Sequence, residues 1–365
     1  SSSPYDASYL LKPKGQITGM KVKNLNDDTW LLSSIFYDKK YRVIQQVTGH
    51  ILNGEDHVYN IYDFSGNVIN SKLNHTKGAN TTTIQREFEY DHMNRLLKAW
   101  HRINSEDKIL MVEHESNELG ELIDKYQHSE DEGTSFSQSI DYRYNIRGWL
   151  TKMNESDLDT AGTEDPIDFF GMELAYENDL GIGSEPDFYN GNISAVKWTG
   201  LEGDDGSERA YKFGYDHVNR IKSSDYTYLD STTWTQTSAM KVSNITYDAN
   251  GNIKSLTRHN GSGTGLDVLT YDYGSDDAQS NQLLSVTDSG DTDEGFIDGN
   301  TTGDDYEYDK NGNLIKDLNK DITLITYNYL NLPDSISYND GRWIKYIYDA
   351  SGVKLSKIVY DGSAE

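Results

Sequence analysis

The residues best suited to chemistry in this chain lie in an acidic segment, 288–305, that reads DSGDTDEGFIDGNTTGDD. Asp291, Asp293, Asp298 and Asp304 offer hard oxygen ligands among glycines, which is the ligand chemistry that calcium prefers. The segment departs from the EF-hand pattern, which needs a glycine at the sixth loop position and a glutamate at the end. These four aspartates are candidate calcium ligands, and a solvated acidic loop is the simpler interpretation.

Other patterns that carry chemistry are missing from the sequence. It has no G-x-S-x-G nucleophile motif, no H-E-x-x-H zinc motif and no phosphate-binding loop. Histidines crowd the first third of the chain, but no pair has the i,i+4 spacing of a helical metal site; they are His57, His75, His92, His101, His114 and His128. The absence of cysteine excludes disulfides and thiolate sites. We therefore expect no enzymatic activity and no cofactor other than calcium.

Composition and charge narrow the class of protein. The 365 residues include 60 acids and 33 bases, a net charge of −27 that disfavours binding to a phosphate backbone. No apolar run approaches the ~18 residues that a membrane helix requires. Tyrosine outnumbers phenylalanine 27 to 9, and hydrophobic residues make up only 35%. This composition predicts broad, thin β-sheet in which rings pack on the face and hydroxyls reach backbone groups or water.

A repeated motif, Tyr-Asp-x-x-(Gly/Asn), organises the chain. Degenerate copies begin at Tyr37, Tyr144, Tyr189, Tyr271 and Tyr327, and a worn copy is expected within residues 113–126. Six clear copies place their tyrosine, aspartate and glycine or asparagine at Tyr62, Asp63 and Gly66; Tyr90, Asp91 and Asn94; Tyr215, Asp216 and Asn219; Tyr247, Asp248 and Gly251; Tyr308, Asp309 and Gly312; and Tyr348, Asp349 and Gly352.

Each copy is predicted to be a β-hairpin. Alternating residues precede the tyrosine, as strands require. The aspartate is expected to cap the turn by accepting backbone N–H groups one or two residues ahead, and glycine or asparagine supplies the left-handed conformation. A lone hairpin is marginal in water, so successive hairpins should pair into one continuous sheet. The repeated tyrosine and aspartate are interpreted as structural residues.

The motif resembles the YD repeat of RHS (rearrangement hot spot) proteins, which is related to the repeats of teneurins and of toxin-complex C subunits. The resemblance extends from about residue 17 to 360 and includes YRYNIRGWLTKMN at 142–154 and DDYEYDKNGNLIKDLNK at 304–320. It implies an all-β ribbon of hairpins that spirals into a hollow shell, complete or partial, around a toxin or other cargo. The family's self-cleaving core signature is not found, so the RHS core and the C-terminal payload are expected to be absent.

The expected organisation is an N-terminal tail or docking segment at 1–16, the repeat shell at 17–360 and a C-terminal tail at 361–365. The resemblance implies a non-catalytic shell of an exported or cell-surface bacterial protein. Such a shell would encapsulate, display or anchor a cargo, toxin or protein partner within a larger secretion or surface assembly. The alternative is a surface adhesin or glycan-binding module that uses exposed aromatic residues, among them Trp30, Trp100, Trp149, Trp198, Trp234 and Trp343.

Overall fold

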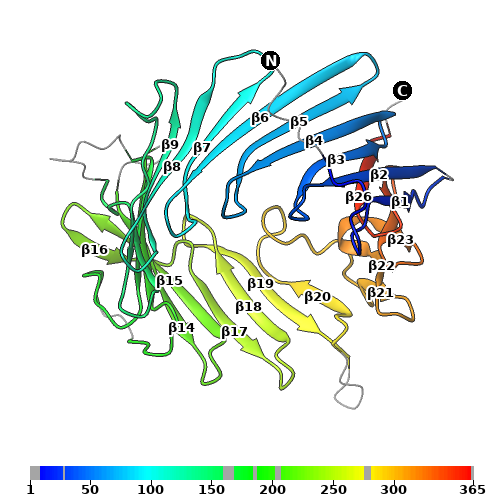
Figure 1. Ribbon diagram of the computed structural model, residues 1–365. Coiled ribbons are helices and arrows are strands. Elements are labelled where there is room, and N and C mark those ends of the chain that lie inside the picture. Colours follow the sequence, from blue (N-terminus) through cyan, green and yellow to red (C-terminus); the bar gives the residue numbers. More distant parts are fainter. Residues whose placement is uncertain are drawn as a thin grey trace. The chain divides into compact units, whose positions relative to one another are not determined.

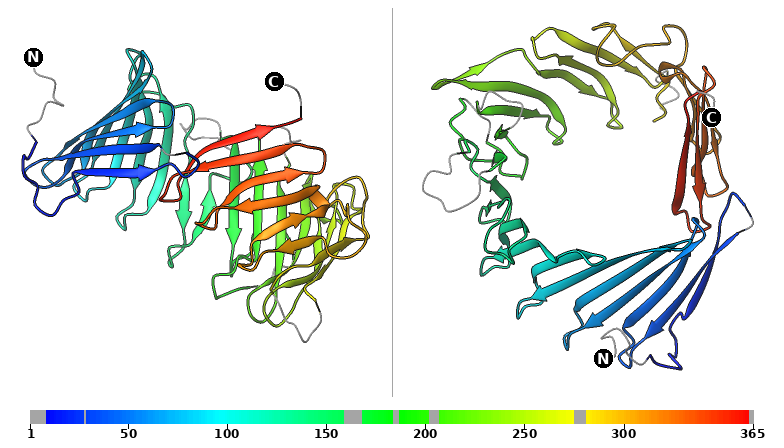
Figure 2. Two further views of the ribbon diagram at one scale, coloured as in Figure 1. Left: turned by 90° about the vertical axis from the view of Figure 1, so that its right-hand side faces the viewer. Right: turned by 90° about the horizontal axis from the view of Figure 1, so that it is seen from above.

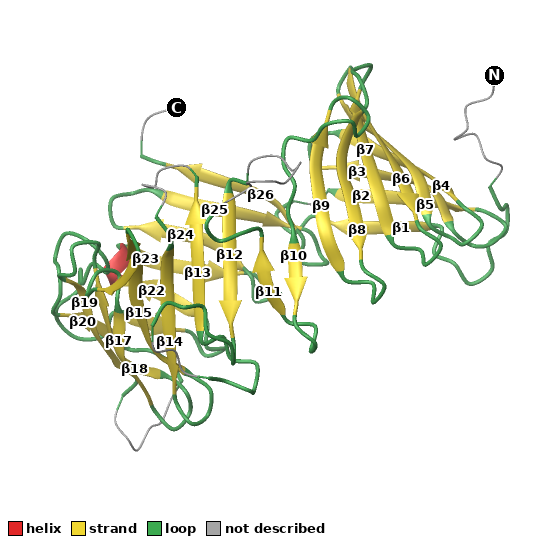
Figure 3. Ribbon diagram, turned by 90° about the vertical axis from the view of Figure 1, so that its left-hand side faces the viewer, coloured by secondary structure: helices red, strands yellow, loops and turns green. Residues whose placement is uncertain are grey.

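The computed structural model describes residues 9–27, 29–158, 168–183, 187–201, 207–274 and 281–362. Over these residues the secondary structure consists of antiparallel β-strands and one short 3-10 helix (Figures 1 and 3), which confirms the predicted all-β class. No helix in the described ranges is long and apolar enough to cross a membrane. The chain divides into two compact units, of which one contains Ile347–Leu355 besides the N-terminal strands and the other contains Phe169–Tyr346.

The N-terminal sheet is a meander in which every strand pairs with the next one along the chain (Figure 2). Its order, β1 to β9, is the arrangement that hairpins joined end to end must adopt. Its nine strands are β1 (Gly19–Lys23), β2 (Trp30–Tyr37), β3 (Val43–His50), β4 (Gly54–Tyr62), β5 (Val68–Lys77), β6 (Asn80–Tyr90), β7 (Leu96–Ile103), β8 (Ile109–Ser116) and β9 (Leu122–Ser129).

The second sheet has eleven strands and keeps the same neighbour-to-neighbour order, except that β16 lies off the path and pairs with β15. Its strands are β10 (Tyr142–Tyr144), β11 (Leu150–Met153), β12 (Phe170–Ala175), β13 (Ala195–Gly200), β14 (Arg209–Tyr215), β15 (Ile221–Asp230), β16 (Thr233–Gln236), β17 (Val242–Tyr247), β18 (Ile253–His259), β19 (Gly265–Asp272) and β20 (Ser285–Asp288).

The third sheet has six strands, again in sequence order. A 3-10 helix, η2 (Leu318–Lys320), connects its second and third strands. The strands are β21 (Tyr306–Tyr308), β22 (Leu314–Asp317), β23 (Ile322–Tyr327), β24 (Pro333–Tyr338), β25 (Trp343–Tyr348) and β26 (Lys354–Tyr360).

The expectation of one continuous sheet is wrong, because hydrogen-bonded pairing divides the strands into three sheets. The divisions fall at irregular connections that interrupt the hairpin pattern. Between β9 and β10 only isolated bridges remain, Asp124↔Asp141 and Gln127↔Gln138. Between β20 and β21 the acidic segment intervenes, and the backbone N–H groups of Asp305 and Tyr306 both donate to the carbonyl of Leu284. Long insertions therefore break the ladder where they separate neighbouring repeats.

The buried interior is thin, as the composition predicts. One cluster of buried apolar side chains lies on β12, β13 and β14 and the following loops; it contains Ala175, Ile182, Ala195 and Ala210, with Leu180 and Trp234 packed against it. Many buried positions are polar, including Asp267 and Asp305 at 0% and 1% exposure. Backbone ladders and polar side-chain bonds must therefore supply much of the cohesion that a thick apolar core gives other proteins.

Two segments outside the first sheet make backbone contacts with that sheet or with the residues next to it. Near the N-terminus, Leu10 donates its backbone N–H to the carbonyl of Tyr37 at 2.7 Å. In the unit that contains β1, the turn after β25 pairs with residues 23–26: Ala350 donates to the carbonyl of Lys23 at 2.7 Å, and an isolated bridge joins Asn24 and Asp349. Of the segment predicted as a tail, residues 1–8 lie outside the described residues, as do 363–365.

Candidate functional site: the row of repeat turns

Each repeat turn is built around its aspartate. In the copy that follows β6, one carboxylate oxygen of Asp91 accepts the backbone N–H of Met93 at 2.8 Å and that of Arg95 at 2.9 Å. The other oxygen accepts the Nε of Arg95 at 2.6 Å. Asn94 adopts the left-handed conformation, with φ of 63°. A single carboxylate thus holds the whole reversal, as the interpretation of the motif requires.

The other clear copies repeat this geometry. The capping aspartates accept backbone N–H groups mostly two and four residues ahead, so the expected distance of one or two residues needs correction. In every copy the fourth residue after the tyrosine has positive φ, which confirms the role predicted for glycine or asparagine. The bonds run to Asp63 from Gly66 and Asn67, to Asp216 from Val218 and Arg220, to Asp248 from Asn250 and Asn252, to Asp309 from Asn311 and Asn313, and to Asp349 from Ser351 and Val353.

The motif tyrosine connects one repeat to the preceding one. In five clear copies its hydroxyl donates to a backbone carbonyl within two residues of the start of the strand that follows the previous turn, as a structural role for this residue requires. The donor–acceptor pairs are Tyr62 to Val43 (2.8 Å), Tyr90 to Val68 (3.0 Å), Tyr215 to Ile193 (2.9 Å), Tyr247 to Ile221 (2.6 Å) and Tyr308 to Leu283 (2.9 Å).

Tyrosines of imperfect copies make the same bond. Tyr37 donates to Ile17 at 2.7 Å and Tyr327 donates to Leu314 at 2.7 Å. Tyr176, which lies outside the copies that the sequence pattern marks, donates to Leu150 at 3.0 Å. Its sequence, Tyr-Glu-Asn, lacks the aspartate after the tyrosine, so only the ring and its place before a turn could have marked it.

A worn copy does occur within residues 113–126, as expected. Its turn uses Asn117 in place of aspartate, and the side-chain oxygen of Asn117 accepts the N–H groups of Leu119 and Glu121, each at 3.0 Å. Gly120 supplies the positive φ of 86°.

Side chains of the turns also link one turn to the next. The Nη1 of Arg42 donates to the carbonyl of Asp63 at 2.8 Å, and the Nη1 of Arg220 donates to the carbonyl of Asp248 at 3.3 Å. The guanidinium of Arg220 also lies over the ring of Tyr247 at 4.3 Å from its centroid, a favourable cation–π arrangement.

Where the turn carries asparagine in place of arginine, an amide bridge replaces the guanidinium. Asn67 donates to the Oδ1 of Asn94 at 2.8 Å, and Asn313 donates to the Oδ1 of Asn331 at 2.6 Å. In these copies neighbouring turns are therefore tied by two kinds of bond, one from the tyrosine and one from the residue after the left-handed position.

These contacts shift the ionisation of the turn residues. The backbone N–H of Arg95 lowers the pKa of Asp91, and the guanidinium of the same residue lowers it further. Partial burial raises the pKa of Asp216, but the stronger combined effect of Arg220 and the N–H of Val218 brings it down to about 2. Burial raises the pKa of Tyr90 and Tyr247. Both shifts favour the ionisation states in which the hydrogen bonds form.

Two of the candidate calcium ligands already use their carboxylates as hydrogen-bond acceptors. Asp291 caps a turn by accepting the N–H groups of Asp293 (2.8 Å) and Glu294 (3.0 Å). Asp298 accepts the N–H of Asp288 at 3.3 Å, and the carbonyl of Asp304 accepts the side chain of Asn300 at 3.2 Å. Within the described ranges these aspartates do not gather three ligand atoms at metal-binding distances. Calcium binding remains a prediction.

A different set of residues does gather. His50, Asp56 and His75 hold ligand atoms within 4.8 Å of one another, the one such group of histidine and carboxylate side chains found in the described ranges. The three residues share no short sequence motif that would mark them as a set. Only the register of three adjacent strands brings them together.

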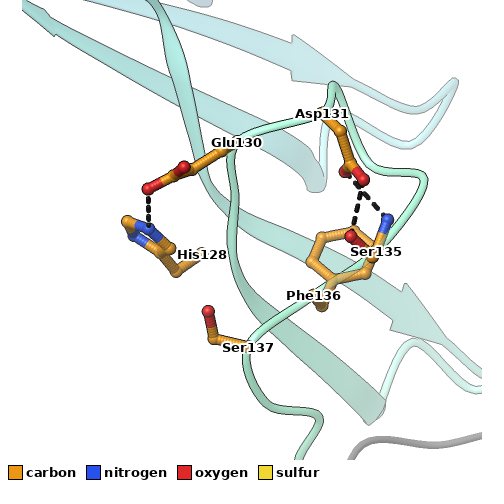
Figure 4. A pocket seen from close by; sticks show the side chains of 6 residues that line it. All are labelled: His128, Glu130, Asp131, Ser135, Phe136 and Ser137. Carbon is orange, nitrogen blue, oxygen red and sulfur yellow. Dashed lines mark hydrogen bonds and ion pairs between the residues drawn. The ribbon is translucent and has the colours of Figure 1, made fainter.

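A cavity of about 440 Å³ lies in the irregular segment after β9 (Figure 4). The hydroxyl of Ser135 donates to Asp131 at 2.5 Å, while His128 lies 3.4 Å from Glu130. Ser135, with Ser129, lowers the pKa of Asp131 to about 2. The serine and the histidine are thus engaged in separate pairs, so this segment shows a capped loop and no serine–histidine pair.

This chain is similar to known proteins in fold. No model of a protein family matches the sequence, and no curated protein matches it. The crystal structure of TcdB2-TccC3-TEV matches with a TM-score of 0.51 and 10% identity over 95% of this chain and 19% of that chain. The chain therefore spans about a fifth of that structure's chain. At this identity the match shows a shared β fold.

Two further structures match with lower scores. They are TcdB2-TccC3 (TM-score 0.22, 10% identity, 88% of this chain and 19% of that one) and a Photorhabdus luminescens Tc holotoxin pore (TM-score 0.17, 9% identity, 92% and 26%). Their scores are too low to support an argument.

Proposed function

We propose that this chain is a non-catalytic structural protein whose repeats form the wall of an RHS-type shell. The observation that carries the proposal is the bond that recurs from motif tyrosines to the preceding repeat, as between Tyr90 and Val68. Because a single hairpin is marginal in water, bonds of this kind make each repeat dependent on its neighbour. Repeats that are linked in this way are suited to form a wall that resists local unfolding.

The biological part of the proposal is that the shell encloses, displays or anchors a cargo, a toxin or a protein partner outside the cell. Two independent lines support it. The repeat motif resembles that of RHS proteins, for which a shell around cargo is implied, and the fold resembles TcdB2-TccC3-TEV. The net charge of −27 also favours a protein partner over a nucleic acid.

The polar side chains support a role without catalysis. The turn aspartates are used as caps, and their lowered pKa values make them poor proton donors or acceptors near neutral pH. The serine and histidine of the loop after β9 bond to different carboxylates.

The glycan-binding alternative finds less support. Of the six tryptophans, Trp30 and Trp343 are exposed, at 47% and 36%. Lys21 lies over the ring of Trp30 at 4.4 Å, and Tyr360 stacks on Trp343 with ring centroids 5.5 Å apart. Each exposed indole thus already has a partner at one face, which reduces the area available to a sugar ring.

Limited proteolysis of the full chain tests the structural part of the proposal. We expect resistant fragments that span several repeats, because cleavage requires neighbouring repeats to open together. Fragments of single hairpins, released at similar rates throughout the chain, would contradict it.

Affinity purification from the natural host, after cross-linking, tests the partner. The proposal expects a second protein recovered in constant ratio to the chain across preparations. Recovery of the chain alone, after efficient cross-linking, would count against an enclosed or anchored partner.

A further inference from the structure

Three side chains with metal-binding chemistry lie on one face of the first sheet. Asp56 on β4 is directly opposite His75 on β5, and His50 at the end of β3 is opposite Gly54, two residues before Asp56. Because side chains alternate along a strand, Asp56 and the two histidines project from the same face. The Oδ1 of Asp56 lies 2.7 Å from the Nδ1 of His75.

Gly54 allows the ring of His50 to cross the intervening strand. A Cβ at Gly54 would overlap the carbonyl oxygen of Thr76 on β5 and would lie 2.7 Å from the Cε1 of His50, so any larger residue would clash with both the backbone of β5 and the imidazole. With the glycine in place, the ring reaches β5, stacks on His75 with centroids 4.7 Å apart, and hydrogen-bonds to the carbonyl of Thr76 at 3.1 Å. Gly54 is therefore required for His50 to approach His75.

We propose that His50, Asp56 and His75 bind a divalent transition-metal ion, with Zn²⁺ as the best match. Two imidazoles and one carboxylate form a common three-ligand zinc set, with the remaining position left to water. Zinc–ligand bonds of about 2.0–2.1 Å place ligand atoms roughly 3.3 Å apart in a tetrahedral site. The ligand atoms here already lie within 4.8 Å of one another, so side-chain rotation brings them to bonding distance.

The surroundings fit a metal ligand set. Asp56 and His75 keep 35% and 38% of their side chains exposed, which leaves a route for the ion. The carbonyl of Thr76 requires a proton on the Nε2 of His50, and the Nδ1 of that ring accepts the N–H of Leu52 at 3.2 Å. Bonding through either nitrogen replaces one of these two bonds, while the other continues to orient the ring.

Such an ion would join β3, β4 and β5 across two strand pairings. This inference is independent of the proposed shell function, because it concerns one group of side chains within a single sheet. An ion bound to the folded chain and not to the unfolded one also raises the unfolding temperature.

The test is calorimetric titration of the full chain with ZnCl₂, paired with thermal unfolding with and without Zn²⁺. We expect one ion per chain with micromolar affinity and a higher unfolding midpoint. His50→Ala and His75→Ala should each weaken binding by about tenfold or more and remove the thermal shift.

His57→Ala is the matched control. His57 belongs to the same strand but projects from the opposite face, where it pairs with Glu55 at 3.0 Å. This variant should retain the affinity of the wild type. Far-UV circular dichroism establishes that each variant is folded. The proposal is overturned if the wild type shows no saturable zinc binding, if His50→Ala and His75→Ala bind as the wild type does, or if His57→Ala weakens binding equally.

Discussion

The phenolic hydroxyl of Tyr90 donates a 3.0 Å hydrogen bond to the backbone carbonyl of Val68, 22 residues earlier in the chain. The donor belongs to one repeat and the acceptor to the preceding one. Equivalent bonds recur along the chain, so tyrosine at the motif position makes a contact between repeats. A phenylalanine would fill the same space but could not make the bond.

Tyr90→Phe should therefore lower the free energy of unfolding by about 1 kcal/mol, the usual net value of a hydrogen bond. Urea denaturation measures the change. Tyr189→Phe is the matched control, because Tyr189 is 68% exposed, and its effect should stay within about 0.5 kcal/mol. Equal effects of the two substitutions would show that the bond to Val68 contributes nothing.

Substitution of a turn glycine that has positive φ should destabilise the protein through backbone strain, even where the added side chain meets no neighbouring atom. Gly66 has φ of 103°, and a Cβ built there meets nothing within 4 Å, so Gly66→Ala measures backbone strain alone. We expect a loss of about 1–2 kcal/mol in the free energy of unfolding.

Gly265→Ala is the control for this experiment. Gly265 has equally open space but no positive φ, so alanine there should be neutral or slightly stabilising. If Gly66→Ala is as well tolerated as Gly265→Ala, the turn does not depend on the left-handed residue.

The turn can be predicted from the sequence to a large degree, because its chemistry is local. The aspartate, the residue with positive φ and the following strand all lie within a few residues of one another. The carbonyl that Tyr90 contacts could not be predicted, because it depends on how two hairpins align. The proposed metal-ligand set could not be predicted for the same reason, because Asp56 and His75 become neighbours only through strand register. The division into three sheets depends on the insertions, whose sequence has no periodic pattern.

Acid should weaken the turns over a defined range of pH. The pKa of Asp216 is lowered from 3.8 to about 2, so the folded state favours the ionised carboxylate. Its contribution to stability is present above pH 3.8 and is lost as the pH falls through about 2. The difference in urea midpoint between the wild type and Asp216→Asn should shrink over this interval. A difference that stays constant from neutral pH to the acid limit would refute this linkage.

Alkali should act through the tyrosines. Burial, together with the charge of Asp317, raises the pKa of Tyr306 from 10.0 to about 12. The stability that this tyrosine contributes is present below pH 10 and is lost as the pH rises through about 12. Spectrophotometric titration should show phenolate forming late, and Tyr306→Phe should remove one late-titrating group. Titration of every tyrosine near pH 10, while the chain remains folded, would contradict the burial of Tyr306.

Hydrogen exchange of Tyr90→Phe tests the dependence of one repeat on the next most directly. Mass spectrometry of peptides from the wild type and the variant compares backbone protection in the hairpin of Tyr90 with that in the preceding turn and strand, residues 62–77. If neighbouring repeats support each other through the tyrosine bond, exchange in residues 62–77 should accelerate along with exchange around Tyr90. Acceleration confined to the hairpin of Tyr90, with residues 62–77 as protected as in the wild type, would show that the repeats fold independently.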